Sequence, residues 1–374
     1  MIKILHCGDL HLDSPLKNLD VTKSEMRRNE LRAAFTSMTM FARTNRVDFL
    51  LIAGDLFDAE FVSKDTVALI GREFAAMPDC RIIIAPGNHD PYNGSSYYKR
   101  AEFPDNVYIF DSEEVQCIEF PDKNTTVYGY AFTGAHMTES PLGGISVEDP
   151  SRINILLAHG DLDAPSSQYS PLSTAELSSC GFDYIALGHK HTHETMRIGS
   201  AYAAYCGCID GRGFDECGEK GAVMAVADKQ TELKFASKFV RFGKRVYTTE
   251  TLDVSGAKSN ADVLEKIGEL VSQKSYADDV ALRLRLTGTV SGDFKLSRKV
   301  IGDRFEKFFI FELVDETAPV LDGEMLRRDP TVKGAFYRSL EAMLESDDPE
   351  ERECAALALR CGLAAISGND FADI

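Results

Sequence analysis

Pro86-Gly87-Asn88-His89-Asp90 is the stretch from which the fold and the function of this chain can best be approached. It follows the apolar run 81–85, which predicts a buried strand, and the Pro-Gly pair ends that strand sharply. An amide, an imidazole and a carboxylate therefore follow one another at the C-terminal end of a strand. Because open α/β sheets hold ligands in the crevice at that end, the turn is a candidate functional site. Taken alone, such a turn also occurs by chance.

The composition is that of a folded protein large enough for two domains. The chain has 374 residues, 44% apolar and 27% charged, so extensive disorder is not expected. No apolar run is long enough to span a bilayer, and residues 1–6 begin a strand rather than a signal peptide. We therefore expect a cytoplasmic protein without a membrane partner. Nine scattered cysteines argue against disulfides, and Cys206, Cys208 and Cys217 are expected to be small buried side chains rather than a thiolate metal site.

The net charge of −18 restricts how this chain could bind nucleic acid. An acidic surface repels phosphate backbones at long range, whereas nucleic-acid-binding proteins usually carry the opposite charge. A nucleic-acid substrate would need bound metal, a local basic patch or a partner protein. One basic cluster could contact phosphates or could be an ordinary solvated face. Its members are Arg283, Arg285, Lys295, Arg298, Lys299, Arg304 and Lys307.

Hydrophobic periodicity predicts an α/β beginning and a strand-rich continuation. The first strands are expected at 2–6, 48–53 and 82–85, with helices between them at about 22–46 and 64–77. Ser24 is expected to cap the first helix, and the β-α-β-α-β order predicts a parallel sheet. Further strands are expected at 107–110, 115–120, 126–132, 152–158, 183–187, 202–206, 222–227 and 231–241. The predicted fold class is α/β, with two packed mixed β-sheets flanked by helices.

A smaller unit is expected after residue 240. Its predicted elements are a strand at 246–253, a helix at about 259–273 and strands at 280–287 and 306–314. Two helices should follow, the first with an apolar stripe made of Val332, Phe336, Leu340, Met343 and Leu344. We therefore divide the chain into a main domain (1–240), an α+β capping domain (241–318) and a C-terminal helical tail (319–374).

Five short motifs at predicted strand ends supply groups that bind metal ions. They are Asp9-x-His11, Gly54-Asp55-x-x-Asp58, Gly87-Asn88-His89-Asp90, His159-Gly160 and Gly188-His189-x-His191. Carboxylate, amide and imidazole ligands together suit manganese, iron or zinc. So many ligands fit two ions that share a carboxylate, an arrangement that clamps both oxygens of a phosphoryl displacement. Each motif alone could be an ordinary hydrogen-bonded turn, but five at one sheet edge favour a dinuclear site.

These motifs resemble the calcineurin-like metallophosphoesterase superfamily over roughly residues 1–240, which implies that family's sandwich of two sheets. Within the superfamily, residues 6–16 are similar to the SbcD and YhaO type of bacterial DNA-repair exonuclease. The stretches 54–58, 128–132 and 186–191 support that similarity.

The resemblance implies a role for each residue of the motifs. Asp9, His11 and His191 would hold one ion, Asp55 would bridge, and Asn88, His159 and His189 would hold the other. His89 would contact the scissile phosphate and protonate the leaving oxygen, with Asp90 fixing its tautomer. A hydroxide activated by two divalent ions, with manganese preferred and iron or zinc as alternatives, would attack the phosphodiester.

Several neighbouring residues are assigned other roles. Asp13 and Asp58 are expected to hydrogen-bond near the ions rather than bind them. His6 and His136 are expected to be structural, and His193 lies outside the frame that Gly188 sets. Lys190 could face either a substrate phosphate or solvent.

The implied function is a DNA exonuclease acting in DNA repair. The cap would shape access for the DNA substrate, and the C-terminal helices would bind an SbcC-like ATPase partner; a homodimer is also open. One alternative is a metallophosphoesterase acting on a cyclic nucleotide, another small phosphodiester or a phosphoprotein, which the acidic charge favours. A second is a non-catalytic scaffold, which the complete ligand set disfavours.

Overall fold

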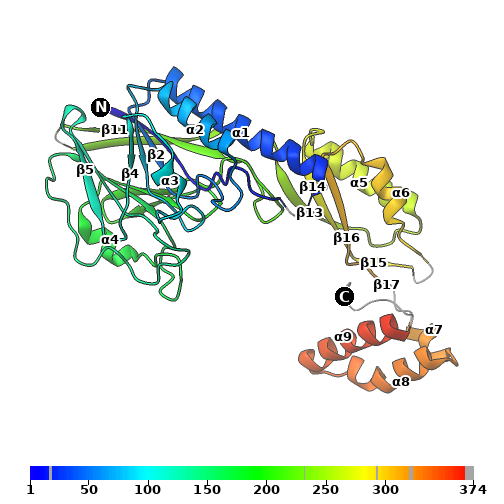
Figure 1. The fold of residues 1–374 in the computed structure, drawn as a ribbon. Helices are drawn as coiled ribbons and strands as arrows, with labels where there is room; N and C mark the ends of the chain where they lie inside the picture. Colours follow the sequence, from blue (N-terminus) through cyan, green and yellow to red (C-terminus); the bar gives the residue numbers. More distant parts are fainter. Residues whose placement is uncertain (17–18, 231, 292–293, 320–322, 367–374) are drawn as a thin grey trace. The chain divides into compact units, whose positions relative to one another are not determined.

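The computed structural model describes residues 1–16, 19–230, 232–291, 294–319 and 323–366 (Figure 1). The chain divides into two compact units, Met1–Val246 and Tyr247–Ile374. The first ends slightly beyond the expected boundary at residue 240, because Arg245 is buried and donates to Glu30 at 2.6 Å. The three-part division stays a prediction, and residues 320–322 and 367–374 of the expected tail lie outside the described residues.

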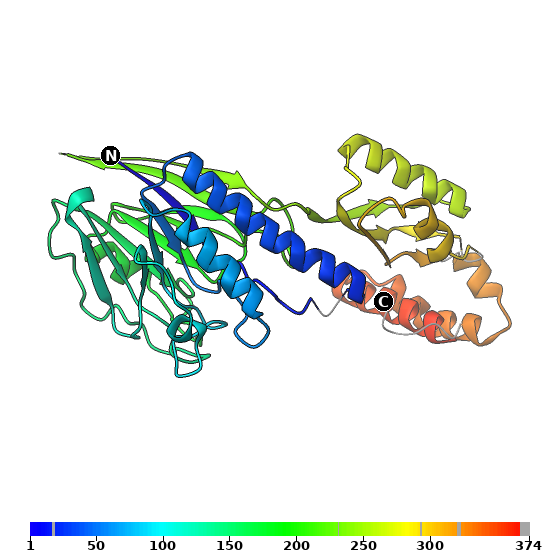
Figure 2. The same ribbon diagram turned by 45° about the horizontal axis from the view of Figure 1, so that its top comes forward.

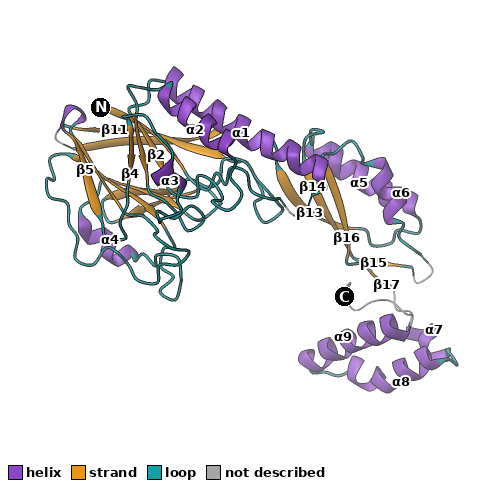
Figure 3. Cartoon of the chain, viewed as in Figure 1, coloured by secondary structure: helices purple, strands orange, loops and turns teal. Residues whose placement is uncertain are grey.

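Two six-stranded mixed sheets form the first unit (Figure 3). The first sheet has the order β12 (Leu233–Arg241), β11 (Gly221–Lys229), β1 (Ile2–Cys7), β2 (Phe49–Ile52), β3 (Arg81–Ile84) and β4 (Val107–Ile109). The second has the order β5 (Gln116–Phe120), β6 (Thr125–Gly129), β7 (Ile153–His159), β8 (Tyr184–Gly188), β10 (Ala201–Tyr205) and β9 (Glu194–Ile198). Strands β1 to β4 are parallel, as are β6, β7, β8 and β10. The predicted α/β class with two mixed sheets is confirmed.

The two sheets pack face to face over a shared apolar core. Ile4, Leu51 and Ile83 of the first sheet belong to the same buried cluster as Val127 and Ile155 of the second, all without exposed surface. Burying each such side chain contributes roughly 1.5–3 kcal/mol relative to leaving it exposed. This core holds the carboxyl ends of strands from both sheets in fixed positions.

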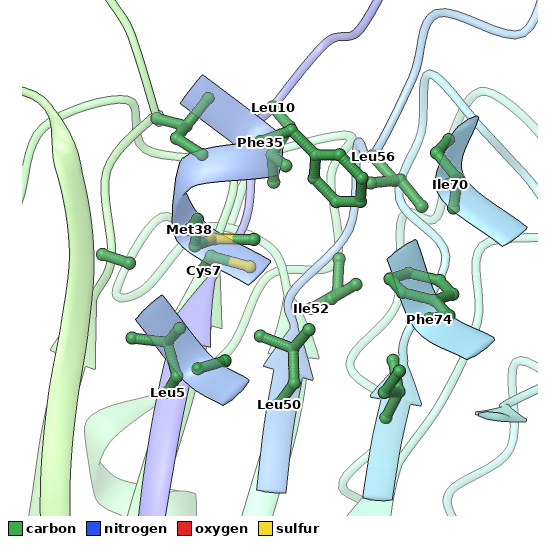
Figure 4. Packing of buried hydrophobic residues seen from close by; sticks show 14 of the residues in the cluster. Leu5, Cys7, Leu10, Phe35, Met38, Leu50, Ile52, Leu56, Ile70 and Phe74 are labelled. Atoms are coloured by element: carbon green, nitrogen blue, oxygen red, sulfur yellow. The ribbon is translucent and has the colours of Figure 1, made fainter. Parts of the chain in front are cut away.

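Helices α1 (Val21–Thr44) and α2 (Lys64–Ala75) run side by side over the outer face of the first sheet (Figure 2). Phe35, Met38 and Phe74 project from them onto strand residues such as Leu50 and Ile52 (Figure 4). Phe35 and Met38 therefore lie on the buried face of α1.

The expectation that Ser24 caps α1 is wrong. Asp20 is the N-cap, and its carboxylate accepts from the Lys23 N–H at 2.8 Å. Ser24 lies one turn inside the helix and donates to the Leu16 carbonyl at 3.2 Å. An apolar stripe predicts the face of a helix well but does not fix its first turn.

The remaining elements of the first unit are short. They are α3 (Tyr97–Arg100), a 3₁₀ turn (Pro121–Lys123) and α4 (Thr174–Cys180). The sequence did not predict α4 or the edge strand β9. In β9 only Ile198 is buried, and Met196 and Ile198 form an alternation too short to indicate a strand.

The second unit begins with a parallel three-stranded sheet. Its elements are β13 (Tyr247–Asp253), α5 (Asn260–Lys274), β14 (Ala281–Thr287), α6 (Arg298–Arg304), β16 (Ile310–Asp315) and the short pair β15 (Thr289–Val290) and β17 (Ala318–Pro319). Three members of the basic cluster form ion pairs, Arg283 with Glu312, Arg285 with Glu316 and Lys307 with Asp278. These pairs favour the interpretation of an ordinary solvated face.

The two predicted helices are α8 (Val332–Leu344) and α9 (Pro349–Ile366), and a short helix that was not predicted, α7 (Gly323–Arg328), precedes them. Phe336, Leu340 and Leu344 of the predicted stripe pack around a cluster that includes Leu326 and Leu359. The stripe is therefore largely a packing face within this chain. Across the part of the chain that the structure describes, no helix is both long enough and apolar enough to cross a membrane.

Candidate metal centre

The seven expected ligands follow the carboxyl ends of five strands drawn from both sheets. Asp9 and His11 follow β1, Asp55 follows β2, Asn88 follows β3, His159 ends β7, and His189 and His191 follow β8. Because these parallel strands end at one edge of the sandwich, residues 180 positions apart become neighbours. The structure brings all seven together.

One group lies around His11. Its Nε2 is 3.3 Å from Nε2 of His191, and Oδ1 of Asp9 is 3.9 Å from the same His191 atom. Two imidazole nitrogens and a carboxylate oxygen that converge in this way could hold one divalent ion.

A second group lies around His159. Its Nε2 is 3.0 Å from Oδ1 of Asn88 and 3.3 Å from Nδ1 of His189. Asp55 lies between the groups, because its Oδ2 is 3.5 Å from Nε2 of both His11 and His159. The arrangement suits two ions with a shared carboxylate.

The backbone at this edge adopts conformations that side chains disfavour. Asp9, His11, Asp55 and His189 have φ of 50°, 43°, 51° and 95°. Non-glycine residues held in the left-handed region cost free energy and cluster at functional sites. A Cβ at Gly87 would lie 2.3 Å from Oδ1 of Asp55, so this close approach requires glycine.

Each of the four histidines has an oxygen near the ring nitrogen that faces away from the convergent atoms, and for His11, His191 and His159 this contact is a hydrogen bond. The pairs are His11 with Asp58 (2.7 Å), His191 with Glu216 (2.7 Å), His159 with the Ala53 carbonyl (2.9 Å) and His189 with Asp161 (3.5 Å). Metal-binding histidines usually donate their other N–H in this way, which fixes the tautomer. The residues present therefore fit a dinuclear divalent metal site.

His89 lies beside these groups with about half of its side chain exposed (52%). Its Nδ1 is 3.3 Å from Oδ1 of Asp58, and this hydrogen bond raises the pKa of His89 to about 9. Cations bound nearby would oppose that shift. The geometry therefore places an imidazole with a carboxylate partner beside the two groups.

The expectation that Asp90 fixes the His89 tautomer is wrong. Asp90 is fully buried and accepts hydrogen bonds from the N–H groups of Gly87 and Leu56, both at 2.7 Å, and from the Tyr98 hydroxyl at 2.6 Å. Neighbouring residues in a tight turn point in different directions, so Asp90 holds the turn together. Asp58 is the carboxylate in contact with the His89 ring.

Other residues singled out in the sequence lie outside the two groups. Asp13 forms an ion pair with Arg32 and accepts from the Ser63 N–H at 2.9 Å. His6 contacts the Tyr184 hydroxyl, His193 the Tyr205 carbonyl, His136 the Tyr169 ring, and Lys190 the Tyr205 ring. Cys206 and Cys208 are buried as expected, whereas the expectation that Cys217 is buried is wrong, because it lies exposed in the loop before β11.

A cavity of about 740 Å³ opens beside the candidate centre. Its lining includes Asn88, His89, Tyr169, Arg212 and Phe61. His89 and Asn88 thus join the candidate metal groups to a space large enough for part of a nucleotide chain.

Sequence reasoning missed Glu216 and Asp161 as partners of His191 and His189. Asp161 directly follows the His159-Gly160 motif, so its position offered a hint. Glu216 lies between β10 and β11 in a stretch without hydrophobic periodicity, and nothing local links it to His191.

Comparison with known proteins agrees with this geometry. Residues 2–193 match the calcineurin-like phosphoesterase family. The chain is 26% identical over 299 residues to the uncharacterized metallophosphoesterase YhaO of Bacillus subtilis (strain 168), covering 77% of this chain and 72% of that protein. It is 23% identical over 248 residues to the SbcD component of the SbcCD nuclease of Staphylococcus epidermidis, covering 58% of this chain and 63% of that protein.

Among solved structures, TT1561 of Thermus thermophilus matches with 13% identity and a TM-score of 0.37, covering 64% of this chain and 99% of that one. The family match spans more than half of the chain and includes all seven of the convergent residues, from Asp9 to His191. This protein belongs to the calcineurin-like phosphoesterase family.

Proposed function

We propose that this protein is a dinuclear-metal phosphodiesterase that degrades DNA as an SbcD/YhaO-like exonuclease in DNA repair. The observation that carries the proposal is the convergence of two histidine groups on one oxygen of Asp55, with His89 at the adjoining cavity. Family membership supports phosphoester hydrolysis, and the similarity to a relative named as part of a nuclease supports DNA as the substrate.

Each residue of the centre has a task in this reaction. The ions, for which manganese is our first choice and iron or zinc the alternatives, supply Lewis-acid activation of water and neutralise phosphate charge when bound. Asp55 would be shared by the two groups, and the oxygen partners of the histidines orient their rings. A protonated His89 ring donates its Nδ1–H to Asp58 and gives its Nε2 proton to the leaving oxygen, which leaves the ring neutral.

Arg212 lines the cavity, and its guanidinium pairs with Glu216 of the same lining at 2.7 Å. The cavity also carries acids, which include Asp58, Glu60 and Asp215. A phosphodiester that enters would therefore depend on bound cations to offset the acidic lining.

The test is degradation of end-labelled DNA with manganese, magnesium, iron or zinc by the wild-type chain, His89→Gln and a matched control, His193→Gln. His193 is an imidazole outside the two groups, so its variant should retain activity. The proposal predicts manganese-dependent release of nucleotides by the wild type and the control. It would be refuted if the wild type hydrolysed no DNA with any of these ions.

A small phosphodiester is the second candidate substrate. The acidic cavity lining and the net charge of −18 favour it, since a short substrate brings fewer phosphates into that field. Turnover of a cyclic nucleotide or of bis(p-nitrophenyl) phosphate without DNA hydrolysis would select this candidate. Turnover of both would keep DNA as a substrate.

We further propose that the C-terminal helices dock an SbcC-like ATPase. Val332, Met325 and Leu357 are 68%, 66% and 48% exposed, so α7 to α9 offer apolar side chains to a partner. Co-elution with a purified SbcC-like ATPase, lost in the Val332→Asp/Met325→Asp double variant, would support this role. Identical elution of the two versions would contradict it, and elution volume alone would report a homodimer.

A further inference from the structure

We propose that Glu216 is a positioning residue for the ion held by Asp9, His11 and His191, and that it acts selectively on that ion. The inference rests on the dinuclear site of the proposed function. It deepens that proposal by assigning a role to the segment 206–220, which links β10 to β11.

Glu216 contacts the ring of His191 directly. Its Oε1 is 2.7 Å from Nδ1 of His191, and the residue is only 2% exposed. His191 is also the most exposed member of its group, with 28% of its side chain accessible, against 1% for His11. A ring that is not enclosed on all sides needs a hydrogen bond to hold its orientation.

Arg212 fixes the carboxylate of Glu216 in turn. The Arg212 backbone N–H donates to Oε2 at 2.7 Å, and its guanidinium donates to Oε1 at 2.7 Å from Nη2 and 3.1 Å from Nε. Cys208 Sγ lies 3.6 Å from Oε2. The carboxylate that receives His191 is thus held by several donors from the same segment and cannot turn away.

The same segment also holds the backbone of His191. The buried Lys220 donates from Nζ to the His191 carbonyl at 2.7 Å. Gly207 has φ of 72°, and a Cβ there would lie 2.9 Å from the backbone nitrogen of His193. Both the ring and the main chain of His191 are therefore set by residues 206–220.

The chemical consequence concerns one nitrogen. With the Nδ1–H donated to Glu216, the Nε2 lone pair of His191 faces His11 and Asp9, and the carboxylate makes that nitrogen a stronger donor. Within the described contacts, the Glu216 side chain reaches His191, Arg212 and Cys208. None of these belongs to the Asn88, His159 and His189 group, so that group should be insensitive to Glu216.

The experiment measures equilibrium manganese binding to the full chain by titration calorimetry and by electron paramagnetic resonance of the free ion. The variants are Glu216→Ala, Glu216→Gln and the control Glu219→Gln. Glu219 lies in the same segment, is 65% exposed and pairs with Arg241, so it should leave both affinities unchanged.

Glu216→Ala should weaken the affinity for one of the two ions by about 10–100-fold and leave the affinity for the other within about twofold of wild type. Glu216→Gln, which keeps an acceptor oxygen but loses the charge, should fall between Glu216→Ala and wild type. Crystals of Glu216→Ala in limiting manganese should lose anomalous density beside His191 and keep it beside His159.

Unchanged binding of both ions, or equal weakening of both, would overturn the inference. Unfolding of both Glu216 variants before metal is added would assign Glu216 to loop stability instead, and would overturn it too. The proposed function fails separately, if the wild type binds two ions and cleaves no phosphodiester.

Discussion

The two halves of the candidate metal centre differ in what holds their histidines. In the His11 and His191 half, carboxylates of Asp58 and Glu216 accept the outer N–H at 2.7 Å. In the other half, His159 donates to the backbone carbonyl of Ala53 at 2.9 Å, and His189 is 3.5 Å from Asp161. The histidines of the first half are oriented by charged side chains, whereas His159 of the second half is oriented by the backbone of the first sheet.

This difference has consequences for how the protein can be altered. A carboxylate partner raises the donor strength of an imidazole and can be removed by a single substitution. A backbone carbonyl at the end of β2 cannot be removed without disturbing the sheet. We therefore expect single substitutions to change the metal affinity of the first half more than that of the second. The substitutions below test this difference.

The largest effect should come from Asp55→Ala, because Asp55 is within 3.5 Å of both halves. We expect loss of both ions at micromolar manganese and phosphodiesterase activity at the level of the uncatalysed reaction. Equilibrium dialysis with elemental analysis, beside a diester assay, measures both. A variant that keeps both ions at wild-type affinity would show that the two halves do not share this carboxylate.

Next comes His89→Gln, which should lower kcat by about 10²–10⁴-fold because it removes the proton donor. Both ions should remain bound, since His89 is not one of the seven proposed ligands and pairs with Asp58 instead. Single-turnover cleavage and manganese binding on the same preparation check this. The assignment fails if activity matches wild type, or if the loss of activity is explained by loss of an ion.

Asp58→Asn should have a smaller effect that falls on the first half of the centre. Asp58 contacts His11 at 2.7 Å and His89 at 3.3 Å. Loss of its charge should therefore weaken the affinity for one ion by about 10–100-fold and slow turnover. Asp161→Asn, the corresponding change in the second half, should reduce metal affinity and turnover less because the His189 contact is longer. If Asp161→Asn proved the more damaging, the contrast between the halves would be wrong.

The smallest effect lies away from the centre, at Glu30. Burial alone would raise the pKa of Glu30, but hydrogen bonds from Arg245, Arg27 and Lys244 outweigh it and lower that pKa to about 2. A carboxyl whose pKa is lowered on folding stabilises the protein above its usual pKa, and that stabilisation is lost as the pH falls toward the folded value.

Glu30→Gln should therefore lower the Tm by a few degrees at neutral pH and leave a smaller difference near pH 2. Thermal unfolding of both metal-free chains across that range checks the sign. Manganese binding should be unchanged, because Glu30 contacts none of the seven ligands. A pH-independent difference in Tm would mean that the charge of Glu30 is not what stabilises α1.

The ligands of both halves were predictable because each follows a buried apolar strand. Ile82, Ile83 and Ile84 have no exposed surface, and such a run marks β3 and the turn to Asn88 without further information. The order of strands and helices then indicates that these turns meet at one edge. That convergence is a property of topology, which hydrophobic patterning encodes.

The partners of the ligands were harder to predict because they depend on side-chain direction and loop path. Asp90 adjoins His89 in sequence but turns into the backbone, while Asp58 reaches the ring from another strand end. Glu216 meets His191 through a loop whose route no periodicity encodes. Edge strand β9 escaped prediction for a related reason, since exposed side chains carry no pattern.

Anomalous diffraction at the manganese edge, from crystals of the full chain grown with manganese, tests the central claim most directly. The account predicts two peaks about 3.5–4 Å apart on either side of the Asp55 carboxylate. One should lie beside Asp9, His11 and His191, and the other beside Asn88, His159 and His189. A single peak, or a peak held by Asp58 and His89 in place of either group, would contradict it.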